Sequence, residues 1–194
     1  PQFNGGQQPG DVKYADINGD QKVDSNYLTI ISMDNSTPKV IAGMSFGGSY
    51  KRFDLAVLFQ GATKVNRLLD GMARNFFVGG SRNTYVDLLD YWTPDNRDAL
   101  YPRPWEGPHP NNSMTSNLYM RDASYIRLKS VDFGYTFSDK VIDRLGVGNL
   151  RVYFSGANLF VIDKLKMFDP EMESSTGSYY PQQRTLNLGL NLTF

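Results

Sequence analysis

Cysteine is absent from the sequence, and histidine occurs once, as His109. Without cysteine the chain can form no disulfide, no thiolate nucleophile and no cysteine-bound zinc site. A single histidine excludes histidine-rich metal sites and leaves little for a histidine-based catalytic triad. We therefore expect no enzymatic activity, and we assign no catalytic residue.

An excess of charge of either sign is also missing, because 20 basic residues balance 20 acidic residues in a chain of 194. A balanced composition gives no electrostatic footprint for nucleic acid or for anionic lipid. The longest apolar run covers only residues 55–59, far short of the roughly 18 residues of a membrane helix. We expect no nucleic-acid partner, and any contact with a membrane must be made by strands.

Strict alternation marks residues 185–194. Leucine or phenylalanine occupies every second position, and threonine, asparagine or glycine occupies the positions between them. Such a strand has one apolar and one polar face, and its length suits a membrane-crossing strand of about 9–11 residues. A strand of a soluble β-sandwich alternates in the same way, so this segment alone favours neither interpretation.

Residues 40–51 and 52–61 repeat the alternation and predict a hairpin. Tyr50 and Phe53 bracket the short turn, as they would in the aromatic girdle of a membrane barrel. Cross-strand aromatic packing in a soluble sheet produces the same pattern.

Two further alternating segments, residues 124–137 and 150–162, bring the number of predicted strands to five. The connections between strands are alternately short and long, which is the topology of outer-membrane barrels. Five strands are too few to close such a barrel. We therefore predict an all-β fold of antiparallel strands that belongs to something larger.

Two basic residues disturb the strand at residues 124–137. Arg127 and Lys129 share a parity with Val131, and a charge on a lipid-facing parity is costly in the middle of a membrane. We expect either that both residues stand above the bilayer or that a β-bulge resets the register before Val131.

Aromatic residues in the long loops are candidates for substrate contact. Residues 84–92 predict a short amphipathic helix, capped by Asn83 or Ser81 and followed by a proline-rich aromatic loop. Rings flanked by polar side chains can stack on sugars, although such loops more often pack on themselves. The candidate substrate-binding residues are Trp92, Trp105, Tyr179 and Tyr180.

An acidic turn near the start of the chain resembles part of an EF-hand loop. Oxygen-bearing side chains and one backbone carbonyl stand at alternate positions, which suits calcium. The sixth position is Gln21 instead of glycine, and the twelfth is Tyr27 instead of an acid. An Asx turn that satisfies its own backbone is the alternative. The candidate calcium ligands are Asp16, Asn18, Asp20, Lys22 and Asp24.

Several motifs, in order along nearly the whole chain, resemble the C-terminal end of SusC/RagA-type TonB-dependent outer-membrane transporters. The matching stretches are GDVKY at 10–14, DINGD at 16–20, YWTP at 91–94, SYIRLK at 124–129, LRVY at 150–153, NLF at 158–160 and residues 184–194. The acidic turn departs from the family pattern at Gln21 and Tyr27.

The resemblance implies a barrel of 22 strands with an N-terminal plug in the bacterial outer membrane. It implies import of oligosaccharides or peptides with a SusD-like surface lipoprotein, energised through TonB by way of the plug. The partners implied are the N-terminal remainder of the barrel, the SusD-like protein, TonB and outer-membrane lipid. In this scheme residues 1–39 and 62–123 are extracellular loops, 40–61 are a strand hairpin, and 124–194 hold the last three strands.

The resemblance also implies that the end of the chain carries the signal read by the barrel-assembly machinery. The matching positions are Leu188, Leu190, Leu192 and Phe194. An alternative function is a soluble extracellular β-domain that binds glycans and is stabilised by calcium. A hydrolase ranks last, because its candidate carboxylates fall in one turn-rich segment, at Asp87, Asp90, Asp95 and Asp98.

Overall fold

The computed structural model describes residues 6–24, 29–78, 83–106, 109–172 and 174–194. The chain forms two compact units, and each is assembled from separate stretches of sequence. The first unit contains Pro1–Ser36, Asn66–Arg121 and Met172–Tyr179, and the second contains Thr37–Val65, Asp122–Glu171 and Tyr180–Phe194. We call them the loop unit and the sheet unit.

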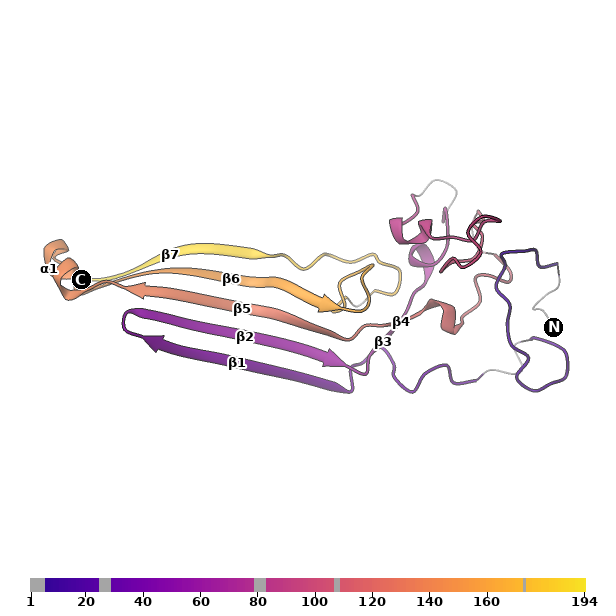
Figure 1. Ribbon diagram of the computed structural model, residues 1–194, viewed down its shortest axis with the longest axis horizontal. Coiled ribbons are helices and arrows are strands. Elements are labelled where there is room, and N and C mark those ends of the chain that lie inside the picture. The colour runs from indigo at the N-terminus through magenta and orange to yellow at the C-terminus, as the bar shows by residue number, and fades with distance from the viewer. Residues whose placement is uncertain (1–5, 25–28, 79–82, 107–108, 173) are drawn as a thin grey trace. The chain divides into compact units, whose positions relative to one another are not determined.

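The sheet unit is built on five antiparallel strands in the order β1-β2-β5-β6-β7 (Figure 1). The strands are β1 (Val40–Tyr50), β2 (Phe53–Thr63), β5 (Tyr125–Thr136), β6 (Asn149–Asp163) and β7 (Thr185–Thr193). Strands β1 and β7 form the two edges, so the described residues make an open sheet and no closed barrel. The five strands predicted from alternation are confirmed.

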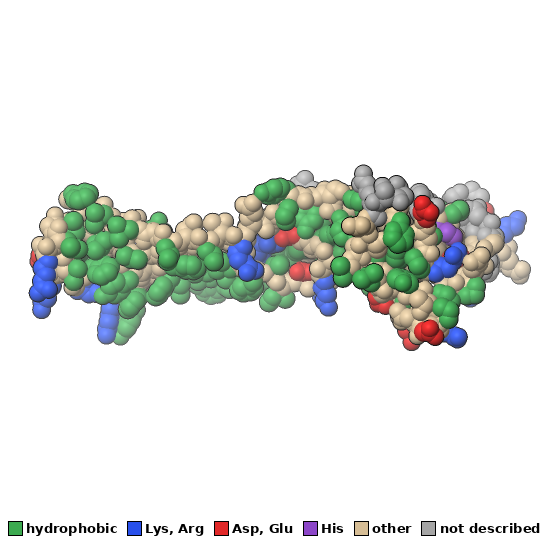
Figure 2. All heavy atoms as spheres, turned by 90° about the horizontal axis from the view of Figure 1, so that it is seen from above, with side chains coloured by type: hydrophobic (Ala, Val, Ile, Leu, Met, Phe, Trp, Pro, Cys, Tyr) green, Lys and Arg blue, Asp and Glu red, His purple; other side chains and the backbone are tan. Residues whose placement is uncertain are grey.

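The register places most of the large apolar side chains of the five strands on one face. One row across the sheet runs through Gly48, Leu55, Phe133, Phe154 and Leu188, which are successive partners. Antiparallel partners point to the same face, so the alternation read in each strand adds up to a continuous apolar surface. Hydrophobic side chains accordingly cover the strands in Figure 2.

A β-bulge lies at Lys129. It was one of the two arrangements that the sequence predicted for Arg127 and Lys129. Phe59 pairs with Leu128 and Leu58 pairs with Ser130, so Lys129 is skipped. The extra residue moves Arg127 to the polar face while Val131 stays on the apolar face. The predicted reset of the register is therefore confirmed.

The short connections of the sheet unit adopt compact turns. Lys51 takes a left-handed conformation with φ of 56° in the turn between β1 and β2. Helix α1 (Asp139–Leu145) fills the connection between β5 and β6 and ends at Gly146, whose φ is 68°. No helix in the described part of the chain is long and apolar enough to cross a membrane.

The loop unit has little regular structure but a buried core. Its elements are β3 (Asn66–Leu68) and the 3-10 helices η1 (Gly71–Ala73), η2 (Val86–Leu89) and η3 (Asn117–Tyr119), and β3 pairs with β4 (Met120–Asp122). Leu69, Phe76, Leu88 and Tyr119 are almost completely buried. The long stretch without alternation is thus packed structure.

The helix predicted over residues 84–92 is wrong, because only the single 3-10 turn η2 forms there. Tyr85 at its start provides no side-chain cap. At its end the chain turns away, because the backbone N–H of Trp92 donates to the carbonyl of Tyr101 at 2.9 Å. Of the two predicted caps, Ser81 lies outside the described residues, and Asn83 lies before the turn without capping it.

Candidate functional site

The loop unit contains a hollow of about 500 Å³ beside the first described loop. The lining residues are Gly10, Asp11, Val12, Lys13, Trp92, Ala99, Leu100, Tyr101, Pro102, Asn117 and Leu118. Gly10 lies so close to the Trp92 ring that an added Cβ would stand 2.4 Å from a ring carbon, and its φ is 89°. Glycine is therefore required where this loop crosses the indole.

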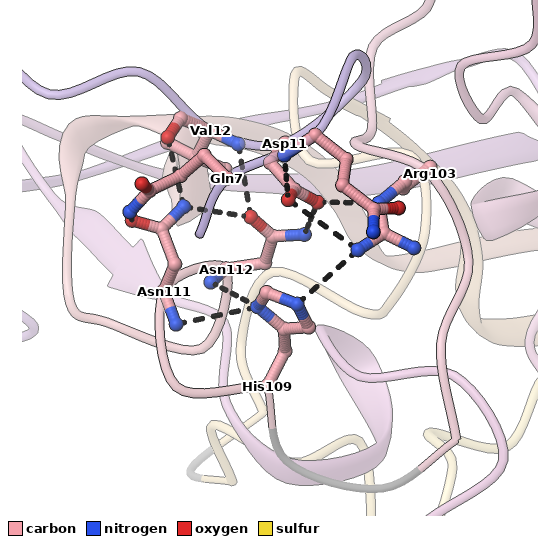
Figure 3. A network of polar contacts seen from close by, with 8 residues as sticks. Gln7, Asp11, Val12, Arg103, His109, Asn111 and Asn112 are labelled. Carbon is pink, nitrogen blue, oxygen red and sulfur yellow. Dashed lines mark hydrogen bonds and ion pairs between the residues drawn. The ribbon is translucent and has the colours of Figure 1, made fainter. Parts of the chain in front are cut away.

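One wall of the hollow is held by a buried carboxylate, Asp11, whose side chain is 1% exposed (Figure 3). The Arg103 Nε donates to Asp11 Oδ1 at 2.6 Å, and the Asn112 side-chain amide donates to the same oxygen at 2.8 Å. The backbone N–H of Gln8 donates to Asp11 Oδ2 at 2.9 Å. Burial alone raises the pKa of Asp11, but these hydrogen bonds outweigh it and hold the pKa below its usual value.

Two asparagines fix the next residue of the same loop (Figure 3). The Asn112 Oδ1 accepts from the backbone N–H of Val12 at 2.9 Å, and the Asn111 Nδ2 donates to the Val12 carbonyl at 2.8 Å. Side-chain amides thereby take the place of a neighbouring strand. The Nδ1 of His109 accepts the backbone N–H groups of Asn111 and Asn112 at 3.2 and 3.1 Å, which orients the two side chains.

Two tyrosine hydroxyls bind the backbone carbonyls of the two asparagines. The Tyr14 hydroxyl donates to the Asn111 carbonyl at 2.8 Å, and the Tyr119 hydroxyl donates to the Asn112 carbonyl at 2.5 Å. Burial raises the pKa of Tyr14 to about 12 and raises that of Tyr119 further. Both phenols therefore stay neutral donors. This network binds one loop segment to another, and it contains no nucleophile paired with a base.

The four candidate substrate residues do not meet at one place. Trp92 lines the hollow described above, whereas Trp105 lines a different one with Phe77, Pro104 and Glu106. The Trp105 ring is buried and packs edge-on against Phe76, with ring centroids 5.2 Å apart. Tyr179 is half-buried in the loop unit, and Tyr180 is 80% exposed in the sheet unit. Their role in substrate contact stays a prediction.

The acidic turn is stabilised by its own backbone. Asp16 accepts the N–H of Gly19 and of Gln21, each at 2.8 Å, and Asp20 accepts the N–H of Lys22 at 2.8 Å. The hydrogen bond from Asn18 and that from the Lys22 amide hold the pKa of Asp20 below its usual value. Tyr27, the twelfth position, lies outside the described residues. The calcium ligands, which include Asp24, stay a prediction.

The described residues contain no group of three histidine, aspartate or glutamate side chains placed to hold a metal ion. The acids considered for a hydrolase are exposed. Asp90 accepts from the Asn96 side chain at 3.1 Å and from the Leu100 N–H at 3.3 Å, so it closes a turn.

The polar face of the sheet unit carries an ion-pair cluster that the sequence did not reveal. The Arg151 guanidinium binds the carboxylates of Asp54 on β2 and Asp132 on β5. It crosses Gly134, where an added Cβ would stand 2.3 Å from Arg151 Nε. The alternation in the sequence predicts that Asp54, Asp132 and Arg151 all lie on the polar face of the sheet. Which of them become neighbours depends on how the strands pair, and only the structure shows that.

A second cluster ties the loop after β6 to the bulged part of β5. The Arg127 side chain, 4% exposed, contacts Asp169 at 2.7 Å and Glu171 at 2.6 Å. The ammonium of Lys129 binds Glu171 at 2.9 Å. The two basic residues that disturb the strand pattern are therefore neutralised by acids about 40 residues further along the chain.

Comparison with known proteins gives consistent matches over most of the chain. The chain is 31% identical over 95% of its length to TonB-dependent receptor P26 of Formosa agariphila, and 28% identical over 96% to TonB-dependent receptor SusC of Bacteroides thetaiotaomicron. It covers 20% and 18% of these relatives, or about a fifth of their length. No family model matches.

Among solved structures, the RagAB peptide transporter matches 82% of this chain with a TM-score of 0.65 and 27% identity. The match covers 17% of that chain. The RagAB peptide importer in its closed-closed state matches equally well, with a TM-score of 0.65 and 26% identity.

Proposed function

Because this chain is homologous to SusC-like TonB-dependent receptors and to RagA over most of its length, we propose that it forms part of the wall and outer loops of an outer-membrane importer. TonB-dependent receptors are transporters of the outer membrane and not enzymes. The sheet unit supplies wall strands, and the loop unit supplies extracellular loops.

The continuous apolar face of the sheet is the observation that carries this proposal. Leu188 is 84% exposed and Phe194 is 91% exposed, and the same face continues through Phe133 and Phe46. Exposing this much apolar surface to water is unfavourable, whereas lipid accepts it at no cost. The opposite face holds the Arg151 cluster, which suits a polar barrel interior.

Rings gather at the end of the apolar face near the β1–β2 turn. Phe53 lies 4.8 Å from Tyr135 and 5.8 Å from Phe133, and Tyr135 lies 5.1 Å from Phe137, all between ring centroids. Aromatic residues concentrate where a membrane meets water. This cluster supports a membrane boundary beside the short turn.

The cargo and partners follow from the relatives and remain part of the proposal. One matching structure is named a peptide transporter, and oligosaccharides are the other cargo that the family resemblance implies. We propose that a SusD-like lipoprotein delivers the cargo and that TonB drives the cycle through a plug outside these residues. Trp92 in the hollow of the loop unit is the best placed of the candidate contacts. Leu188, Leu190, Leu192 and Phe194 serve as the assembly signal.

Cysteine mapping tests the wall placement directly, in a full-length receptor from which any cysteine outside these residues has been removed; the 194 residues themselves contain none. Leu188→Cys and Leu190→Cys in the full-length receptor should react with a lipid-soluble maleimide and resist a charged one. The matched variants Asn187→Cys and Asn191→Cys, on the opposite face of the same strand, should show the reverse preference. Equal reaction of all four with the charged reagent would reject the proposal in favour of a water-exposed domain.

A further inference from the structure

The apolar face has a hollow of about 400 Å³ close to the β1–β2 turn. Its floor is Gly48, where an added Cβ would meet nothing within 4 Å. Phe46 and Tyr50 stand on either side of Gly48 along β1, and Phe53 and Phe133 stand across the neighbouring strands. One missing side chain in a row of large ones therefore leaves an apolar slot between aromatic walls.

Two cations stand beside the slot, in an adjoining hollow that shares Ser49, Phe53 and Asp54 with it. Lys51 and Arg52 occupy the adjoining turn, are exposed and make no ion pair with an acid of the described chain. The Lys51 ammonium lies 5.3 Å from the centre of the Tyr50 ring, so it stays at the edge of the slot. Lys and Arg side chains are prominent at this end of the sheet in Figure 2.

The acids nearby leave this charge available. Asp54 is one of the residues that line the slot. Its carboxylate, however, is bound by Arg151 on the opposite face of the sheet. Asp139 at the start of α1 lines a second, more polar hollow with Lys51 and Arg52 without forming an ion pair with either. A carboxylate this close weakens the local positive potential without cancelling two charges.

We propose that this slot binds one anionic glycerophospholipid, with an acyl chain over Gly48 and the phosphate between Lys51 and Arg52. The inference rests on the proposed wall placement of the sheet. Short turns of outer-membrane barrels face the periplasm, so the lipid belongs to the inner leaflet. The apolar slot matches the acyl chain of such a lipid, the aromatic rim matches its glycerol region, and the two cations match its phosphate headgroup. The three features follow one another in the same order as these parts of the lipid.

The charge half of the site is tested with the full-length receptor in nanodiscs of equal phosphatidylglycerol and phosphatidylcholine. Native mass spectrometry counts the lipids retained after release. The double variant Lys51→Asn/Arg52→Gln should lower retention of phosphatidylglycerol by about fivefold per charge removed; asparagine tolerates the left-handed conformation of Lys51. The matched variant Lys140→Gln/Arg144→Gln removes two exposed charges from α1, outside the slot lining, and should change little.

The apolar half is tested by filling the slot. Gly48→Leu should lower retention of both lipids, whereas Ala42→Leu adds similar bulk to the same face of β1 outside the slot and should leave retention unchanged. Asp139→Asn should raise phosphatidylglycerol retention. Equal retention by the parent and both slot variants, in receptors that insert normally, would overturn the lipid site alone. Failure of the parent to insert would instead contradict the wall placement.

Discussion

The two units of this chain bury apolar side chains in opposite ways. The loop unit hides Leu69, Phe76 and Tyr119 within an irregular fold, whereas the sheet unit leaves a whole row of leucines and rings exposed. The unit with regular strands thus exposes its apolar side chains, and the unit with irregular structure buries them in a core. A strand satisfies its backbone through its neighbours and can leave its side chains to the surroundings. An irregular loop needs side chains to hold it.

Truncation of a ring in the loop unit should have the largest effect. Phe76 is 2% exposed and packs against Tyr91 and Trp105, so Phe76→Ala should lower local stability by about 3–5 kcal/mol. Hydrogen exchange of the full-length receptor measures this at the Leu69 N–H, which donates to the Tyr119 carbonyl. Unchanged protection of that amide would mean that the loop unit does not rely on its core.

Neutralising the buried acid should rank second. Asp11→Asn leaves Arg103 without its carboxylate and should cost about 2 kcal/mol at neutral pH. Because the folded pKa of Asp11 is lowered, its contribution is complete above the unfolded pKa of about 3.9 and is lost as pH falls through the lower folded value. Hydrogen exchange near Val12 should therefore depend on acid pH in the parent and much less in Asp11→Asn.

A methyl group on the polar face of the sheet should have a smaller effect. Gly134→Ala pushes the Arg151 side chain off its two carboxylates, and because that side chain can move and the ion pairs are exposed to solvent, we expect only a small loss of stability. Gly48→Ala on the opposite face meets open space and is the control. Urea denaturation of the reconstituted receptor compares them; equal midpoints would show that the ion pairs add nothing.

The smallest effect is expected for Leu188→Ala. This side chain is 84% exposed in the sheet, so in lipid the substitution should change stability by less than about 1 kcal/mol. The gel shift of the folded receptor on heating is a suitable measure. A loss as large as that of Phe76→Ala would mean that Leu188 packs against protein, and the contrast between the two units would disappear.

The sequence predicted the sheet unit well for a physical reason. A period of two is imposed separately on each strand by its two faces, so it can be read without knowing the partners. The same rule exposed Arg127 and Lys129 as misfits, and their conflict with Val131 anticipated the bulge. Balanced net charge, in contrast, concealed the local pair Lys51 and Arg52, because composition averages over position.

The loop unit could not be predicted in the same way. Asp11 and Arg103 form an ion pair although they are 92 residues apart in the sequence. Asn112 accepts a hydrogen bond from Val12, which is 100 residues away in the sequence. No local periodicity signals such pairs. The helix expected at residues 84–92 failed because a tertiary hydrogen bond at Trp92 overrode local propensity. The acids that neutralise Arg127 were equally invisible in the sequence pattern.

The shape of the loop unit depends on the Asn112 side-chain amide, and therefore on the survival of that one amide bond. Its Nδ2 donates to Asp11 at 2.8 Å, and asparagine is among the thermolabile residues. Hydrolysis to aspartate would turn this donor into a second carboxylate facing the first, with no change in side-chain size. Attraction would become repulsion beside the Trp92 hollow. A receptor that ages by this single reaction would keep its sheet unit and lose the order of its loop unit.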